Sequence, residues 1–357
     1  MANVIIYTCA YNAEKTIART IESVMNQTYQ DFVYILINNA STDGTEEIMR
    51  AYGHKYKDKI YMHNLHHNDL RNYGLHFLAF NFMAQSISQW ATIIDADDEW
   101  TPDFLEKTVK FGEDNDLYLV ACGYDKIDAV TSELIKRRTA PQNLIVSGDG
   151  FKDDFINYRG FCNFWWGKLY KIANPMCVDY GIAGDHKMYE DSLFTLSVVK
   201  SLYENNWKFG VISDTCFKYY IDKNSYSFTK IELAVETYEE LYEGTKYVLE
   251  SFGKVSKLNR DFLYAIYLSI MNDIIEWILF SGISDTQKII WIEEVLRKPL
   301  AAETFARKEF DARIKSLAER DVFLDSIGKK VQIMANKSNS VLVDRVNDSI
   351  TALKKLL

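Results

Sequence analysis

The chain has 357 residues, which is enough for two domains that each bury a hydrophobic core. Hydrophobic residues make up 48% and charged residues 25%, an ordinary globular composition. The formal net charge of -9 argues against a general nucleic-acid-binding protein, because phosphate contacts need clustered Lys and Arg. An acidic protein can still bind a phosphorylated ligand if a metal ion supplies positive charge.

The cysteines and the apolar segments indicate the cellular compartment of the protein. The N-terminus lacks the basic start and long apolar run of a signal peptide. The most apolar stretch, Leu263 to Ile283, contains Asn272, Asp273 and Glu276, so we predict a buried amphipathic helix and no membrane span. Five scattered cysteines without a CxxC pair are typical of reduced thiols in a cytosolic protein. They are Cys9, Cys122, Cys162, Cys177 and Cys216. We expect a soluble cytoplasmic protein.

The first hundred residues alternate short apolar runs with helical stripes. The apolar runs predict strands at residues 4–7, 32–37, 59–63 and 90–94. The stripes predict helices at residues 17–25, 45–52 and 75–83. Repeated strand–helix units of this kind predict a mostly parallel sheet with helices on both faces.

Two helix starts carry capping signals. Asp43 is followed three residues later by Glu46, which is the spacing of a capping box. Thr101 and Pro102 are typical of an N-cap and a first helical position. We therefore expect helices to begin at about Thr45 and at Pro102.

Beyond residue 115 the pattern is mixed and then helical. Residues 117–122 predict a strand and residues 124–138 a hairpin, whereas almost everything from residue 231 onward reads as helix, broken at Pro299. We expect an α/β domain at residues 1–230, with a nucleotide-binding half at 1–100 and an acceptor half at 101–230. An α-helical domain would follow at residues 231–357.

Polar clusters follow three of the predicted strands. In an open α/β sheet, ligands bind at the carboxyl ends of the strands, so these clusters would line one crevice. The crevice would hold an aromatic ring, amides, hydroxyls and at least three carboxylates. The clusters are residues 8–14 (TCAYNAE), 38–44 (NNASTDG) and 95–99 (DADDE).

The acidic cluster has two readings. Adjacent carboxylates repel one another unless protons or a cation intervene, and Mg²⁺ or Mn²⁺ takes one or two carboxylates together with substrate phosphates. The same residues would also suit an exposed helix start, where Asp and Glu favour the positive end of the dipole. The position after an apolar strand, beside two other polar strand ends, favours a metal site.

Motifs along the first 230 residues resemble glycosyltransferase family 2, the inverting GT-A transferases. The opening segment runs from IIYTCAYNAEK to NNASTDGTEEIM, and DADDEWTPDFLEK resembles the family's metal motif with the helix after it. WWGKLYK, MYEDSLFTL and CFKYYIDKNSYS follow in the expected order. The resemblance implies a GT-A type, Rossmann-like sheet, a nucleotide-sugar donor, and Mn²⁺ or Mg²⁺ as cofactor.

The resemblance also implies roles for single residues. Tyr11 would lie against the base, and Asp97, with Asp98, would ligate the metal. Asn39 stands where the family usually has an Asp facing uracil; its carbonyl oxygen can accept the ring N–H, but the charge is lost, so the base stays open. The residues that would line the donor pocket are Thr8, Ala10, Tyr11, Asn12, Glu14, Asn39, Asp95, Ala96 and Asp97.

The segment around Asp191 supplies the base that an inverting transfer needs, because one group must take the acceptor hydroxyl proton. By resemblance Asp191 is that general base and Glu190 its neighbour. The residues alone indicate a helix N-terminus, since LFTLSVV follows at helical spacing. Both can hold, because a helix end can orient a carboxylate.

Basic and aromatic residues near the donor are less constrained. Members of the family often carry an Arg on the helix before the metal strand. In this sequence the only basic residue of that helix is His76. Arg71 or Lys223 would then compensate, or the metal would carry the diphosphate charge alone. Trp166 is a candidate for donor binding, and the alternative is core packing.

Three functions follow in order of preference. The first is transfer of a sugar, with a UDP-sugar favoured, to a hydroxyl of a glycan, glycolipid or glycoprotein. The second is nucleotidyl transfer that makes nucleotide-sugars, although TCAYNAEK is not the Gly-rich basic loop that a triphosphate would want. The third is a non-catalytic binding protein. The helical tail favours packing or a homo-oligomer; membrane contact would need a basic face, and its charges are mixed.

Overall fold

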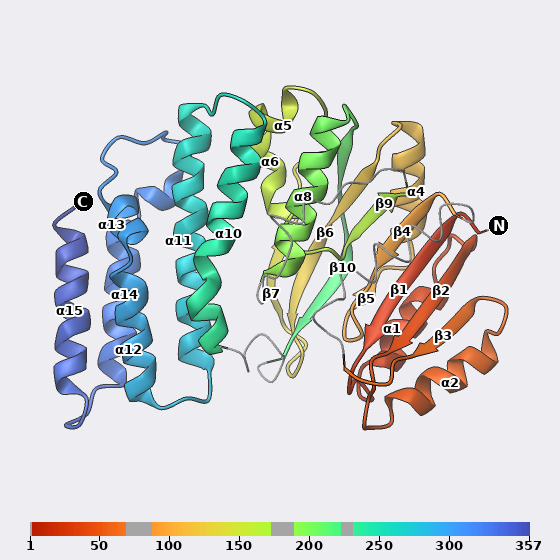
Figure 1. Cartoon of the computed structure of the whole chain (residues 1–357), viewed down its shortest axis with the longest axis horizontal. Helices are drawn as coiled ribbons and strands as arrows, with labels where there is room; N and C mark the ends of the chain where they lie inside the picture. The colour runs from red at the N-terminus through yellow and green to blue at the C-terminus, as the bar shows by residue number, and fades with distance from the viewer. Residues whose placement is uncertain (1, 69–87, 173–188, 223–230) are drawn as a thin grey trace. The chain divides into compact units, whose positions relative to one another are not determined.

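The computed structural model describes residues 2–68, 88–172, 189–222 and 231–357 (Figure 1). The chain divides into two compact units. Unit 1 comprises Met1–Asp185 and Glu190–Asp222, and unit 2 comprises His186–Tyr189 and Lys223–Leu357. The predicted helix at residues 75–83 lies outside the described residues, as do Arg71, His76 and Lys223.

Unit 1 is an α/β fold. Its strands are β1 (Val4–Ala10), β2 (Phe32–Asn38), β3 (Ile60–Asn64), β4 (Trp90–Ile93), β5 (Glu99–Trp100), β6 (Leu119–Asp128), β7 (Leu134–Arg138), β8 (Leu144–Val146), β9 (Lys168–Lys171) and β10 (Phe209–Ile221). Its helices are α1 (Ile17–Met25), α2 (Thr45–Lys55), α4 (Phe104–Asp114), α5 (Gly150–Asp153), α6 (Phe155–Tyr158), the 3₁₀ turn η2 (Arg159–Phe161) and α8 (Glu190–Glu204). The strands predicted in the first hundred residues and the hairpin of β6 with β7 are confirmed.

The described strands form one sheet in the order β3-β2-β1-β4-β9-β6-β10-β5, with β7 beside β6 and β8 beside β10. Strands β3, β2, β1 and β4 run parallel, and so do β6 and β10, while β9 is antiparallel to both of its neighbours. The chain steps from β1 to β2 on one side and returns to β4 on the other. Such a reversal opens a crevice at the carboxyl ends of β1 and β4.

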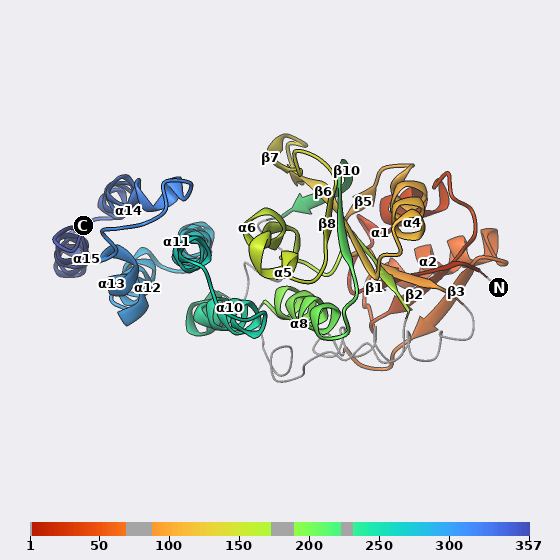
Figure 2. The same ribbon diagram turned by 90° about the horizontal axis from the view of Figure 1, so that it is seen from above.

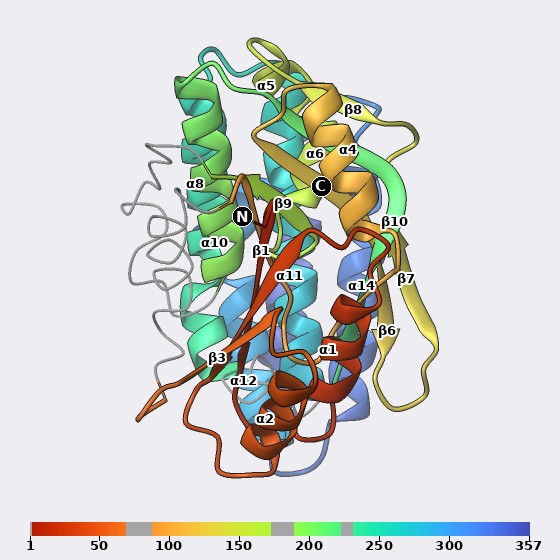
Figure 3. The same ribbon diagram turned by 90° about the vertical axis from the view of Figure 1, so that its right-hand side faces the viewer.

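Helices cover both faces of this sheet, because its central strands are apolar throughout. Strands β1 and β4 are almost completely buried, as continuous apolar runs in a covered parallel sheet should be. Figure 3 shows α8 on one side of the sheet and α1 and α4 on the other, and Figure 2 agrees. The predicted GT-A type, mostly parallel α/β sheet is confirmed in this arrangement.

Helix α2 begins at Thr45 as predicted, but its predicted capping box and the predicted start of α4 are wrong. Helix α2 has Gly44 at its N-cap without a side-chain cap, because the Asp43 carboxylate accepts instead from the Thr45 and Glu14 amides at 3.0 and 3.2 Å. Helix α4 begins at Phe104, two residues later than expected, because the Thr101 carbonyl accepts from the Gln27 side chain at 2.7 Å.

Unit 2 is helical. Its helices are α10 (Ile231–Ser251), α11 (Lys257–Phe280), α12 (Asp285–Leu296), α13 (Pro299–Phe305), the 3₁₀ turn η3 (Lys315–Leu317), α14 (Arg320–Ile333) and α15 (Ser340–Lys354). Ser256 and Ser284 cap α11 and α12 by accepting backbone N–H bonds at 3.2 Å. Pro299 occupies the first turn of α13, so the predicted break is confirmed.

Helix α11 is apolar along most of its length and packs against α10, α12 and α13. Among the helices of the described residues, it alone is long and apolar enough to pass a length-and-composition test for a membrane span, a test that the core helix of a helical unit also passes.

Candidate active site

The candidate site lies in unit 1, where the polar loops after β1, β2 and β4 meet. Because β2, β1 and β4 are neighbours and parallel, their carboxyl ends point to one edge of the sheet. The Asn39 amide donates to the Ala10 carbonyl at 2.8 Å, and the Ile94 amide donates to the Tyr7 carbonyl at 3.0 Å. The backbone thus ties the three loops together.

The loop after β1 is built largely from internal bonds. Thr8 is fully buried, and its hydroxyl bonds to the Tyr34 hydroxyl at 2.7 Å and to the Ile94 carbonyl at 2.8 Å. Ala10 is also buried. We therefore assign these two predicted pocket residues to the wall behind the site, where they fix the loop.

Side chains further along the loop join it to the next one. The Asn12 carbonyl oxygen accepts from the Thr42 amide at 2.8 Å, and Asn12 takes a positive φ of 50° to do so. Glu14 accepts from the Gly44 amide at 2.9 Å. Tyr11 is 40% exposed, so of the predicted residues in this loop it is the one whose side chain can stack on a ligand.

Asn39 is fully buried, and its amide nitrogen donates to the Asn68 side chain at 3.2 Å. The carbonyl end is the one that an N–H of a pyrimidine ring would require.

The acidic loop, residues 95–98, carries three carboxylates with different surroundings. Burial, followed by the charges of Asp97 and Asp191, raises the pKa of Asp95, which the Trp165 side chain hydrogen-bonds. Burial also raises the pKa of Asp97. Ala96 between them is buried. Asp95 and Asp97 are partly exposed and can meet a ligand.

Asp98 faces inward. Its Oδ1 accepts from the Tyr220 amide of β10 at 2.9 Å, and its Oδ2 is buried without a hydrogen-bond partner in the described part of the chain. Burial, with the charges of Asp97 and Asp95, raises its pKa well above the usual value. A buried carboxylate oxygen in this state requires a proton or a nearby cation.

The predicted base lies at the start of α8. Asp191 accepts from the Ser192 amide at 2.7 Å, and burial raises its pKa to about 6 while the charge of Lys168 opposes that rise. Burial and then the charge of Asp191 raise the pKa of Glu190 to about 7. Lys168 is buried and donates to the Phe164 and Trp166 carbonyls, and burial lowers its pKa to about 8.

Tyr219 of β10 connects the acidic loop with the base. Burial raises the pKa of its hydroxyl, and the charges of Asp98, Asp97, Asp191 and Asp95 raise it further. The phenol therefore keeps its proton among four carboxyl groups. The fold thus brings Asp191 into the electrostatic reach of the acidic loop, as the Asp95 environment also shows.

Two aromatic residues of this site, Trp165 and Tyr219, come from the motifs WWGKLYK and CFKYYIDKNSYS, whereas Arg19 belongs to no motif. Trp166 is buried in a stack with Phe164 and Phe217, so the structure moves the expected aromatic contact from Trp166 to Trp165, which bonds Asp95. By resemblance Tyr219, with Tyr220, was expected to close over the diphosphate. Arg19 was missed because it lies in an ordinary helix pattern.

The carboxylates of the acidic loop supply only part of the ligands that a divalent cation needs. Within the described residues no group of three His, Cys, Asp or Glu side chains is arranged as a metal cage. Mg²⁺ and Mn²⁺ often complete their shell with substrate phosphates and water, so a ligand set of one or two carboxylates suffices. The partly exposed Asp97 and the unpartnered oxygen of Asp98 fit that chemistry.

The sheet order and the three polar strand ends define an open α/β fold whose polar loops meet at one edge of the sheet. Residues 5–175 match the family described as Glycosyl transferase family 2. This match identifies residues 5–175, just under half of the chain, as a domain of that family.

Named relatives match the same part of the chain. TuaG of Bacillus subtilis, a glycosyltransferase named for teichuronic acid biosynthesis, is 28% identical over 151 residues, 42% of this chain and 58% of its own length. EpsE of the same organism is 34% identical over 110 residues, 31% of this chain and 38% of its own. The chain therefore covers less than two thirds of these relatives.

The crystal structure of S. aureus TarS 1-349 is similar to this chain in fold. It matches with a TM-score of 0.50 at 16% identity, covering 99% of this chain and 90% of that one.

Proposed function

We propose that the chain is a metal-dependent inverting glycosyltransferase that moves a sugar from a nucleotide-diphosphate sugar to an acceptor hydroxyl. One observation carries the proposal: α8 brings Asp191 into electrostatic reach of Asp95 in the acidic loop, with the Tyr219 hydroxyl among the carboxylates. A transferase of this kind needs a donor site and a base close together, and the family match supports the same reading.

Asp191 acts as the general base in this proposal. The acceptor hydroxyl attacks the anomeric carbon from the face opposite the leaving diphosphate, and Asp191 takes the hydroxyl proton. The Ser192 amide orients the carboxylate. Its pKa of about 6 leaves it ionised at neutral pH and still basic enough to accept a proton.

Asp97 and Asp98 would hold a Mn²⁺ or Mg²⁺ ion, which when bound supplies positive charge to the diphosphate. Asp97 is partly exposed and could contact the ion directly. Asp98 is buried and would add its negative charge from inside the fold. Asp95, with Trp165 on its carboxylate, is placed to orient the ribose or the sugar. Tyr11 would stack on the base.

The donor and the acceptor are proposed by class. A UDP-sugar is favoured, with the carbonyl oxygen of Asn39 as the group for the uracil N–H. A polysaccharide acceptor is supported by the teichuronic acid biosynthesis in the name of TuaG. The helical unit is proposed as a separate domain that packs or forms a homo-oligomer, and a cytoplasmic location stays a prediction.

Nucleoside diphosphate release tests the proposal. We expect one of UDP-glucose, UDP-N-acetylglucosamine, UDP-galactose or GDP-mannose to release its diphosphate slowly to water with Mn²⁺, and EDTA to stop it. Asp191→Asn should lower this rate about 10²- to 10⁴-fold, the usual worth of a general base, with donor affinity unchanged. Asp116→Asn, an exposed residue that pairs with Lys171, is the matched control and should keep the rate.

Two results would count against the proposal. Pyrophosphate release from a nucleoside triphosphate and a sugar 1-phosphate would favour a nucleotidyltransferase. If calorimetry finds no bound nucleotide-sugar with either metal ion, a non-catalytic protein is the better account.

A further inference from the structure

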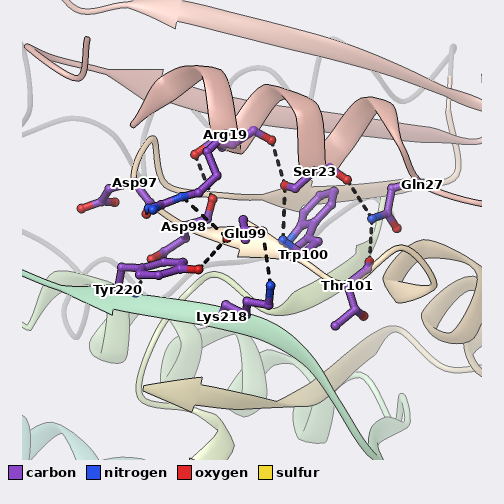
Figure 4. Close-up of polar contacts among 11 residues, drawn as sticks. Arg19, Ser23, Gln27, Asp97, Asp98, Glu99, Trp100, Thr101, Lys218 and Tyr220 are labelled. Atoms are coloured by element: carbon purple, nitrogen blue, oxygen red, sulfur yellow. Dashed lines mark hydrogen bonds and ion pairs between the residues drawn. The ribbon is translucent and has the colours of Figure 1, made fainter. Parts of the chain in front are cut away.

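Side chains of helix α1, and one from the residues just after it, hold the segment that contains the acidic loop. These side chains bond the backbone of the loop and of β5 directly after it, as Figure 4 shows. Thr20 donates to the Asp98 carbonyl at 2.8 Å, Ser23 accepts from the Trp100 amide at 3.3 Å, and Gln27 donates to the Thr101 carbonyl at 2.7 Å. Thr20 and Ser23 lie on one face of α1, and Gln27 follows just after the end of the helix at Met25.

Arg19 extends this row to Asp97. Its guanidinium donates to the Asp97 carbonyl, lies 3.8 Å from the centre of the Tyr220 ring, and places Nε 3.7 Å from Glu99 Oε2. One planar side chain thus contacts the acidic loop, β5 and β10 together. A guanidinium suits this task because it can donate in its plane and stack on its face.

Glu99 is the point where these contacts converge. It also accepts from the Tyr220 hydroxyl at 2.6 Å and pairs with Lys218 at 3.3 Å. Tyr220 in turn donates its amide to Asp98 at 2.9 Å. We call Arg19, Glu99 and Tyr220 the clamp.

The clamp reaches the carboxylates from behind. In Figure 4 the Asp97 carboxyl group points away from the clamp, while the Asp97 carbonyl faces Arg19. Side chains alternate along a strand, so fixing Tyr220 on one face of β10 fixes Tyr219 on the other, toward the carboxylates. The clamp can therefore set the geometry of donor-binding groups without contacting the donor.

We infer that Arg19 is a positioning residue for the nucleotide donor, acting through the Asp97 backbone, Glu99 and Tyr220. This inference rests on the proposed function. It also supplies a role for a cation beside the acidic loop, on a helix other than the one where family members often carry an Arg.

Binding of UDP with Mn²⁺ by calorimetry tests the inference, with GDP in its place if the donor screen selects a GDP-sugar. Arg19→Met should raise Kd about tenfold, the worth of a hydrogen bond to a charged group. Arg19→Lys keeps the charge and loses the planar stack, so it should fall between. Tyr220→Phe loses only the bond to Glu99 and should raise Kd about threefold.

The matched control is Arg137→Met, which removes an Arg ion pair elsewhere, to Asp125 at 2.7 Å on the β6–β7 hairpin, and should leave Kd unchanged. The Arg19→Met, Tyr220→Phe double variant adds a second readout. Because both residues act through Glu99, its loss of affinity should be smaller than the product of the single losses.

The outcomes separate the inference from the proposed function. If the wild type binds and both Arg19 variants bind within twofold of it, or the double variant is multiplicative, the inference fails alone. A wild type that binds no nucleoside diphosphate overturns the proposed function and the inference together. If Arg19→Met does not fold, unchanged affinity in Arg19→Lys and Tyr220→Phe overturns the inference.

Discussion

Two opposing influences act on the pKa of Asp191. The first turn of α8 favours a negative charge through the helix dipole, and the Ser192 amide donates to the carboxylate. Burial outweighs both and raises the pKa to about 6. A carboxylate tuned upward by burial is a better proton acceptor than an exposed one, which is how a base suited to neutral pH arises.

The pH dependence of turnover follows from this pKa. A general base works in its ionised form, so the rate of diphosphate release should rise as pH increases through about 6 and then level off. Rates measured with saturating donor and metal across that range check the expectation. Asp191→Asn should lose this acid limb together with most of the rate, and a limb that persists in the variant would assign the titration elsewhere.

The same shift predicts that the variant folds. A carboxyl group whose folded pKa is raised favours the folded state when protonated, and that contribution is lost as pH rises through about 6. Ionised Asp191 is therefore unfavourable to the fold above this pH. Asp191→Asn should melt no lower than the wild type there, so a lost rate would not reflect unfolding.

At the scale of elements, β6 and β10 form a parallel pair, and β10 carries Phe217 of the Trp166 stack as well as Tyr219. Gly123 of β6 lies where the register with β10 shifts. A Cβ at this position would lie 2.6 Å from the Arg138 carbonyl oxygen and 3.0 Å from that of Asp214. Both are backbone atoms, so a strand would have to move.

Gly123→Ala should therefore lower the free energy of unfolding by about 1–3 kcal/mol, the usual cost of overpacking. Gly53→Ala in α2 is the matched control, because its Cβ would meet the Met62 sulfur at an ordinary 3.5 Å. That control should be neutral or stabilising, since alanine favours helices. Urea denaturation followed by circular dichroism checks both, and equal midpoints would contradict the close approach.

Periodicity predicted these elements well where burial repeats along a run, as in β1, β2 and β4. It failed at the helix caps, because the Gln27 and Glu14 groups that bond the expected capping residues are far away in sequence. The site divides in the same way. Runs after strands pointed to Asp95, Asp97 and Tyr11, whereas Arg19 and Trp165 act through contacts that only the packed fold creates.

At the scale of the whole molecule, similarity to the family model lies in the first half of the chain. The family match covers residues 5–175, and the relatives' matches cover part of their own lengths. Asp191 and the helices of unit 2 lie beyond the family segment. The proposed inverting displacement needs both the donor loops of the first hundred residues and Asp191 as base.

The stereochemistry of donor hydrolysis tests this claim most directly. Proton NMR of the wild type with Mn²⁺ and the active α-linked nucleotide-sugar can record the released sugar before its anomers equilibrate. Because an inverting displacement on an α-linked donor gives the β-configured sugar, we expect the β-anomer to appear first and Asp191→Asn to suppress it. Release of the α-anomer first, or full turnover by Asp191→Asn, would contradict it.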